Sequence, residues 1–361
     1  MASVSLFDPL SIGTVRLKNR ICIPPMVIYG VSDESGMVQP ENVAHYQRLA
    51  RGGAGLVIQE ATCISPEGRL SMDQLGIWSD DQIPGLRAIT DAVHGAECPI
   101  FVQLHHAGVV SIGTDTLCPS DYAFESPRGG FKRGREMTKD EIYRVRDAFI
   151  AGAVRAEKAG YDGIELHGCH GYLLCQFLNS RVNRRTDEYG DPMALVLEIL
   201  AGIRAVVGRK FVIGLRLGAF EPTLADGIAH AKALEQAGIQ FLDVSYGFTA
   251  ESEPEAPGDP AILDVIRAAG EIQKAVSVPV FAVNSIRTPE QAQMILDKTG
   301  VAMVDIGRSA LVDPAWPNKA QAGQQTGKCL GCKVCQWRID REKCPGKLLL
   351  HRQEGWDAVS R

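Results

Sequence analysis

The sequence has 361 residues, of which 45% are hydrophobic and 22% are charged, and its formal net charge is −5. This composition is typical of a soluble enzyme, and the acidic balance argues against a nucleic-acid-binding surface. No apolar run approaches the roughly 20 residues that cross a bilayer, and residues 1–13 lack the pattern of a secretory signal. We therefore expect a cytoplasmic protein that binds neither membranes nor nucleic acid.

Short apolar runs rich in β-branched residues recur along the chain and alternate with helical patterns. They predict strands at 21–26, 56–61, 100–104, 163–166, 211–217, 241–246, 280–284 and 303–307. Several runs follow a glycine that would close the preceding helix, and their continuous apolar character is typical of parallel strands buried on both faces. Residues 1–320 are therefore predicted to form a (β/α)8 TIM barrel, with a doubly wound sheet as the alternative.

Polar residues follow these predicted strands at their C-terminal ends, where the active sites of such barrels lie. Asn284 and Ser285 follow the seventh strand, and Gly307 and Arg308 follow the eighth. These two exits form the usual phosphate-binding corner, where a guanidinium and backbone amides hold phosphate oxygens. The alternative for Arg308 is an ordinary surface arginine at the start of a helix.

Two further strand exits carry side chains suited to a heteroaromatic ring. The amide of Gln103 both donates and accepts, so it can pair with the polar edge of such a ring. Arg216 ends the fifth strand, where a fixed cation would stabilise a developing anion. Its alternative is a structural ion pair with Glu165 or Asp243.

The densest polar patch is His167-Gly-Cys-His170-Gly-Tyr172, directly after the fourth strand. Two histidines three residues apart could bind a metal or hydrogen-bond a substrate carbonyl, and we favour substrate binding. Tyr172 is then a candidate proton donor. Of the neighbouring His105 and His106, we expect His106 to face the site.

These motifs resemble the old yellow enzyme family of FMN-dependent barrels. The matching segments are LFDPLSIGTVRLKNRICIPPM, GLVIQEATCISPEGR, FVQLHHAG, HGCHGYLLCQFLNSRVNRRTDEYG and VDIGRSALVDP. The resemblance covers essentially residues 5–315. The resemblance implies an FMN site with backbone contacts from Pro25, Met26 and Ala61, ring contacts from Gln103 and Arg216, and phosphate contacts from Gly307 and Arg308. Where relatives often carry glycine in the seventh-strand loop, this chain has Asn284 and Ser285.

The resemblance also implies a reaction. FMN would be reduced by NADH, NADPH or another donor, and hydride would pass from flavin N5 to an activated alkene such as an enone, enoate or dienoyl thioester. His167 and His170 would hold the electron-withdrawing group of the substrate, Tyr172 would donate the proton, and Tyr29 would wall the pocket. Relatives often carry Arg or Lys where this chain has Val109 and Val110, so their substrate preferences need not transfer.

The segment 321–361 is predicted to be a cysteine-rich tail. Cys329, Cys332, Cys335 and Cys344 have the spacing C-x2-C-x2-C-x8-C, which favours a [4Fe–4S] cluster over a zinc site. The other six cysteines are scattered singly, as expected in a reducing compartment. Thus the tail is expected to hold a redox cluster, with structural zinc as the alternative.

This tail resembles the iron–sulfur subgroup that includes 2,4-dienoyl-CoA reductase and trimethylamine dehydrogenase, whose clusters relay electrons between flavin domains. No G-x-G-x-x-G segment follows Cys344, so we expect electrons from a separate protein. Residues 328–352 contain seven Lys or Arg against two Asp or Glu, which suits an acidic ferredoxin or flavoprotein. Alternatives are a nucleotide-dependent ene-reductase with zinc, a flavin-linked dehydrogenase or demethylase, and a non-reductive barrel. We also expect a homo-oligomer.

Overall fold

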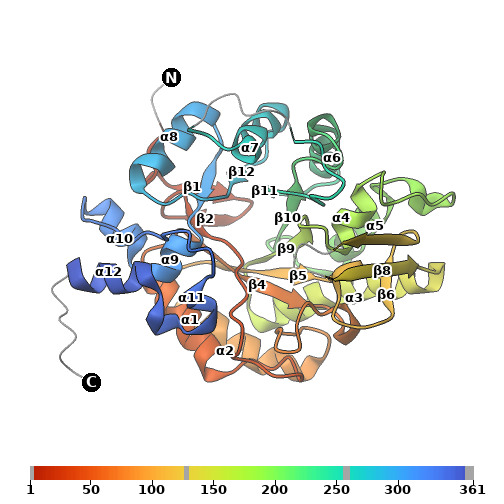
Figure 1. Ribbon diagram of the computed structural model, residues 1–361, viewed down its shortest axis with the longest axis horizontal. Coiled ribbons are helices and arrows are strands. Elements are labelled where there is room, and N and C mark those ends of the chain that lie inside the picture. Colours follow the sequence, from red (N-terminus) through yellow and green to blue (C-terminus); the bar gives the residue numbers. More distant parts are fainter. Residues whose placement is uncertain (1–3, 126–129, 255–260, 354–361) are drawn as a thin grey trace.

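A closed barrel of eight parallel strands forms the centre of the protein (Figure 1). The computed structural model describes residues 4–125, 130–254 and 261–353. In barrel order the strands are β3 (Ile21–Ile23), β4 (Leu56–Cys63), β5 (Ile100–His105), β9 (Gly163–Gly168), β10 (Val212–Gly218), β11 (Phe241–Ser245), β12 (Val280–Ala282) and β13 (Met303–Asp305). All eight predicted strands are present, and the (β/α)8 barrel is confirmed.

Helices surround this barrel and connect its strands. They are α1 (Pro40–Arg51), α2 (Ile83–His94), α3 (Lys139–Ala159), α5 (Ala194–Val206), α6 (Leu224–Gln236), α7 (Asp264–Ala275) and α8 (Pro289–Thr299). Helices α3 and α8 end at Gly160 and Gly300, whose φ angles of 91° and 71° lie in the left-handed region that favours glycine. The predicted glycine ends of the αβ units are therefore confirmed at these two helices. Among the described residues, no helix is long and apolar enough to cross a membrane.

The barrel interior is divided into an apolar layer and a polar layer. Phe101, Phe241 and Phe281 pack at the N-terminal end, together with Ile12 and Leu17 of the hairpin β1 (Leu10–Ile12) and β2 (Val15–Leu17). Side chains alternate along a strand, so positions two residues further on lie in the next layer. The hairpin packs against the N-terminal end of the barrel, and the polar layer lies toward the C-terminal end.

A three-stranded sheet that the sequence reasoning did not anticipate covers part of the C-terminal face. It consists of β6 (Thr116–Cys118), β8 (Phe131–Glu136) and β7 (Tyr122–Glu125). Below it lies α4 (Leu173–Leu178), and Val109 is fully buried in a small apolar cluster with Cys118 and Cys175. Val109, at a position where the family resemblance leads us to expect a cation, therefore packs beneath the covering sheet.

Three barrel strands end two or three residues earlier than predicted. Strand β3 stops at Ile23 because Pro24 and Pro25 have no amide hydrogen to donate to a sheet. Strand β12 stops at Ala282, shortly before Asn284 and Ser285, whose φ angles are 107° and 55°. Strand β13 ends at Asp305. These early ends leave the residues that follow free to form loops around the barrel mouth.

The cysteine-rich tail folds back onto the barrel beside α1. After α9 (Arg308–Val312) and α10 (Trp316–Gln321), it contains α11 (Gln336–Ile339) and α12 (Pro345–Gln353). Figure 1 shows these elements grouped together at one side of the barrel. Residues 354–361 of the predicted tail lie outside the described residues.

Candidate functional site

A cavity of about 190 Å³ opens at the C-terminal end of the barrel, between the loops that follow β3, β12 and β13. Its wall contains seven of the nine residues predicted to contact a flavin: Pro25, Met26, Arg216, Asn284, Ser285, Gly307 and Arg308. In the described part of the chain, Ala61 and Gln103 are buried outside this lining. The barrel thus brings most of the predicted set to one place.

The loop after β12 is shaped by backbone angles that are unusual for its residues. Asn284 and Ser285 have φ angles of 107° and 55°, where L-residues are strained and glycine is favoured. Arg308 Nη2 donates to Ser285 Oγ at 3.2 Å and so links this loop to the start of α9. The exposed guanidinium and the two loops together form a corner suited to an anion.

Arg216 lies at the opposite, buried part of the cavity. Its side chain is 6% exposed, and its Nε atom lies 3.0 Å from Asp243 Oδ2, an ion pair without hydrogen-bond geometry. The ion pair that was the alternative interpretation is therefore present, yet Arg216 also lines the cavity. Arg216 places a fixed positive charge beside the site.

Three buried carboxyl groups surround this guanidinium. Burial raises the pKa of Glu165, Asp243 and Asp305, and the positive charge of Arg216 opposes that rise. Gln103 Nε2 donates to Glu165 Oε1 at 2.6 Å, which orients the amide within the same layer. Burying several negative charges side by side is energetically unfavourable. We therefore expect some of these three carboxyl groups to be protonated.

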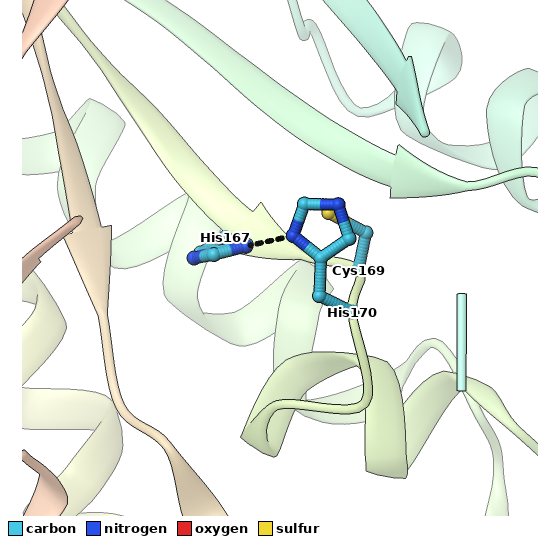
Figure 2. A group of neighbouring side chains, drawn as sticks. All are labelled: His167, Cys169 and His170. Atoms are coloured by element: carbon cyan, nitrogen blue, oxygen red, sulfur yellow. Dashed lines mark hydrogen bonds between the residues drawn. The ribbon is translucent and has the colours of Figure 1, made fainter. Parts of the chain in front are cut away.

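Two histidines form a hydrogen-bonded pair after β9. His167 Nε2 lies 3.1 Å from His170 Nδ1 (Figure 2). On its other side, His170 Nε2 lies 2.8 Å from Ser245 Oγ. His170 has a φ of 59°, and its amide donates to Tyr246 O, so the turn is tied to the end of β11. Burial lowers the pKa of both rings, to about 3 for His170. Both are therefore neutral hydrogen-bonding groups at pH 7.

Tyr172 stands beside this pair at the start of α4. Its ring meets the rings of His105 and His167 edge-on, with centroid distances of 4.5 and 4.8 Å. The structure therefore gathers the three residues predicted for substrate binding and protonation. His170 is the one of the three that lines the cavity described above.

The two histidines lie close to a third side chain that could bind a metal, the thiol of Cys169. Among the described residues, His167, Cys169 and His170 form the one candidate group of His, Cys, Asp or Glu side chains for a metal ion. Their ligand atoms lie within 4.8 Å of one another. However, burial raises the pKa of the Cys169 thiol well above its ordinary value, which disfavours the thiolate that binds metals. The two ring nitrogens that face each other are already hydrogen-bonded. Substrate binding remains the better interpretation.

The expectation that His106 faces the site is wrong. His105 contacts Tyr172 and His167, whereas His106 lies against Gly68 and accepts from the Gly108 amide at 3.0 Å. Strand alternation could have shown this, because Phe101 and Gln103 already point inward and His105 is next in that series. Gln74 holds the His105 ring through a 3.1 Å contact to Nδ1.

Two other residues lie away from the cavity. Tyr29 does not line it in the described structure, and its ring lies beneath Arg338 of the tail. Glu60 is buried and accepts from the Ile28 amide and from the Tyr46 hydroxyl, each at 3.0 Å. It therefore holds the loop that carries Pro25 and Met26.

Sequence and structure comparisons both relate this chain to known oxidoreductases. A family described as NADH:flavin oxidoreductase / NADH oxidase matches residues 5–327. The chain belongs to this family. An NADH oxidase of Thermoanaerobacter brockii is 36% identical over 91% of this chain and 53% of that protein. An NADPH dehydrogenase of Halalkalibacterium halodurans is 35% identical over 87% of this chain and 93% of that protein.

Solved structures of related flavin oxidoreductases have the same fold. A 2-naphthoyl-CoA reductase in complex with 2-naphthoyl-CoA matches with a TM-score of 0.83 and 25% identity, over 93% of this chain and 56% of that chain. Morphinone reductase in complex with tetrahydroNAD matches with a TM-score of 0.76 and 25% identity, over 91% and 93%. The chain therefore spans about half of some relatives and almost all of others.

The residues that line the cavity fit FMN. The cofactor has an anionic phosphate at one end and a ring system that gains negative charge at the other. The cavity has Arg308 at the exposed corner and Arg216 at the buried part, and Pro25 and Met26 form its wall. Arg308 and Ser285 would hold the phosphate, and Arg216 would face the ring.

Glu60 gives the first testable prediction. Burial raises its pKa from 4.5 to about 8, so the folded state binds this proton more tightly than the unfolded state. The free energy of unfolding should therefore fall as pH rises from 4.5 to 8, by up to about 1.4 kcal/mol per pH unit. Glu60→Gln should remove this component, which urea titrations across that range would measure.

The control for this prediction is Glu34→Gln, which removes an exposed carboxylate from the segment between β3 and α1. Its stability profile should remain parallel to that of the unchanged protein. A Glu60→Gln profile that is also parallel would show that Glu60 is ionised in the folded state.

Proposed function

We propose that this chain is an FMN-dependent ene-reductase that reduces an activated carbon–carbon double bond. The observation that carries the proposal is the neutral His167–His170 pair beside Tyr172, at the end of a cavity that fits FMN. When bound, FMN supplies the hydride for such a reduction. The residues of the chain then bind the substrate, polarise it and complete the reaction with a proton.

The histidine pair would hold the electron-withdrawing group of the substrate. Burial keeps both rings neutral, so each carries one N–H that can donate to a carbonyl oxygen without transferring a proton to it. The substrate oxygen would replace the hydrogen bond that now joins His167 Nε2 to His170 Nδ1. Ser245 and the Tyr246 carbonyl hold His170 in place. The fixed histidines would orient the double bond. Their hydrogen bonds to the carbonyl oxygen would strengthen as negative charge develops on that oxygen.

Tyr172 would supply the proton. Its ring packs at right angles to His105 and next to His167, so the hydroxyl is carried by a side chain with restricted motion. A neutral donor suits this step, because a buried histidine with a pKa of about 3 is not protonated at pH 7.

An acyl thioester is the substrate class that we favour among enones, enoates and dienoyl thioesters. One solved relative is a reductase bound to 2-naphthoyl-CoA, in which an unsaturated ring is conjugated to a thioester carbonyl. Such a carbonyl presents the acceptor that the histidine pair requires. The reductant is NADH, NADPH or a protein donor.

The cysteine tail is proposed to hold a [4Fe–4S] cluster that relays electrons to the flavin, as in the iron–sulfur subgroup of this family. Cys329, Cys332, Cys335 and Cys344 line one cavity of about 60 Å³. Cys329 and Arg308 also line the flavin cavity, so the two cavities share a wall. This adjacency supports electron transfer between them.

Local contacts suit thiolate ligands. The Gly331 amide donates to Cys329 Sγ at 3.4 Å, and the Cys329 amide donates to Ser309 Oγ at 3.3 Å. A tetrahedral zinc with bonds of about 2.3 Å would place its sulfurs about 3.8 Å apart. A cubane cluster takes four thiolates, which the four cysteines that line this cavity would supply.

A separate electron carrier would dock on the tail. Cys332 and Cys335 are exposed, and five large apolar side chains of the same tail are exposed as well: Leu330, Val334, Ile339, Leu348 and Leu349. Together with the local excess of Lys and Arg, this surface suits an acidic ferredoxin or flavoprotein.

Tyr172→Phe tests the proton donor. It should slow alkene-dependent flavin reoxidation by about 10²–10⁴-fold, the range typical of general acid catalysis. Flavin reduction should be nearly unchanged, and stopped-flow spectroscopy would resolve the two half-reactions. Tyr143→Phe on α3 is the matched control. An unchanged reoxidation rate would remove Tyr172 as the donor.

Arg308→Ala tests the phosphate contact. Loss of charge-assisted hydrogen bonds of about 1.5–3 kcal/mol should raise the Kd for FMN roughly 10- to 100-fold. The Kd for riboflavin, which has no phosphate, should hardly change when both are measured by fluorescence quenching. Arg209→Ala, at an exposed position before β10, is the control. Equal losses for both ligands would place Arg308 outside the phosphate site.

Cys332→Ser tests the metal. Anaerobically purified protein should contain about four irons per chain with broad visible absorbance, and the variant should lose both while keeping its flavin bands. One zinc per chain in place of iron would contradict the cluster and leave the flavin site standing.

A further inference from the structure

The segment between the third and fourth tail cysteines contacts the loop that follows β3. The guanidinium carbon of Arg338 lies 4.2 Å from the centroid of the Tyr29 ring. Arg341 Nη2 donates to the Tyr29 carbonyl at 3.2 Å, and Arg341 Nη1 pairs with Glu41 at the start of α1. Two arginines of one short segment therefore hold the side chain and the backbone of a single residue.

Apolar packing joins the same two segments. Ile28 of the loop, Val312 of α9 and Trp337 and Cys344 of the tail form one buried cluster. The guanidinium carbon of Arg341 lies 5.2 Å from the centroid of the Trp337 ring, so this arginine is oriented by the cluster as well. One metal ligand position, Cys344, thus belongs to the packing that supports Tyr29.

The held loop begins at the flavin cavity. Pro25 and Met26 line that cavity, and Tyr29 follows three residues later. On the other side, the Ile28 amide donates to Glu60 and the Gly30 amide donates to Asp73. Tyr29 therefore lies between two backbone anchors on the barrel, while the tail covers its ring.

We propose that Arg338 and Arg341 are positioning residues for the substrate pocket, and that the cluster joining the tail cysteines strengthens their hold on Tyr29. The proposal rests on the proposed function and adds that Tyr29, which follows the cavity residue Met26 by three positions, walls the substrate pocket beside the flavin cavity, as the family resemblance implies. Arg338 and Arg341 both lie between Cys335 and Cys344. Binding these cysteines to one metal cluster reduces the conformational freedom of the chain segment between them. This restriction holds both guanidinium groups against the loop.

The kinetic test uses Arg338→Met, which keeps an unbranched apolar stem and removes the cation. The KM for the alkene should rise about 5- to 20-fold, with little change in kcat or in the rate of flavin reduction. Arg338→Lys should recover most of the affinity, because an ammonium also binds an aromatic face. Lys343→Met removes an exposed cation from the same segment without a contact to Tyr29, and should match the unchanged protein.

Hydrogen exchange provides a readout that needs no activity. Amides of residues 26–36 should exchange at least several-fold faster in Arg338→Met, in Arg341→Ala and in Cys332→Ser than in the unchanged protein and in Lys343→Met. Unchanged exchange in these three variants would overturn the proposal, even if the enzyme reduces alkenes. Faster exchange with an unchanged KM would also overturn it. Failure of the unchanged protein to reduce any alkene would instead reject the proposed function.

Discussion

The ion pair between Arg216 and Asp243 is the interaction on which the rest of the site depends. A guanidinium inside a barrel loses its hydration, which is tolerable only because carboxyl groups in the same layer offset the cost. That layer rests on the phenylalanines and the N-terminal hairpin below it. The fold therefore maintains a positive charge at the buried part of the cavity.

The same positive charge influences the neighbouring groups. It contributes to the lowered pKa of His167 and His170, although burial is the larger cause. Neutral histidines beside a cation are suited to binding a polarised carbonyl, because neither ring competes as a proton source. Charge and burial thus assign different roles to groups that lie a few ångströms apart.

Much of the architecture followed from local patterns in the sequence. Continuous apolar runs and helix-ending glycines are signals within one αβ unit, and they predicted the eight strands correctly. The sheet formed by β6, β8 and β7 was missed, because its strands are short and have no clear periodic pattern, and packing over α4 stabilises them. The exact strand ends depended on Pro24 and on the left-handed angles at Asn284 and Ser285.

The site was predictable to a similar extent. Strand exits of a parallel barrel meet on one face, so most predicted flavin residues lie together. The choice between His105 and His106 failed because the alternation within β5 was not followed to its end. The approach of Cys329 to the flavin cavity depends on the return of the tail over α9, a long-range contact that no local spacing encodes.

The angles at Asn284 and Ser285 have a consequence for the mutational tolerance of this loop. In most loops, conservative replacements are accepted because the backbone can adopt many conformations. Here, a β-branched residue at either position would oppose the required φ, whereas glycine would relieve strain and lose a side chain. Sequence variation at these two positions should therefore be governed by backbone geometry more than by side-chain chemistry.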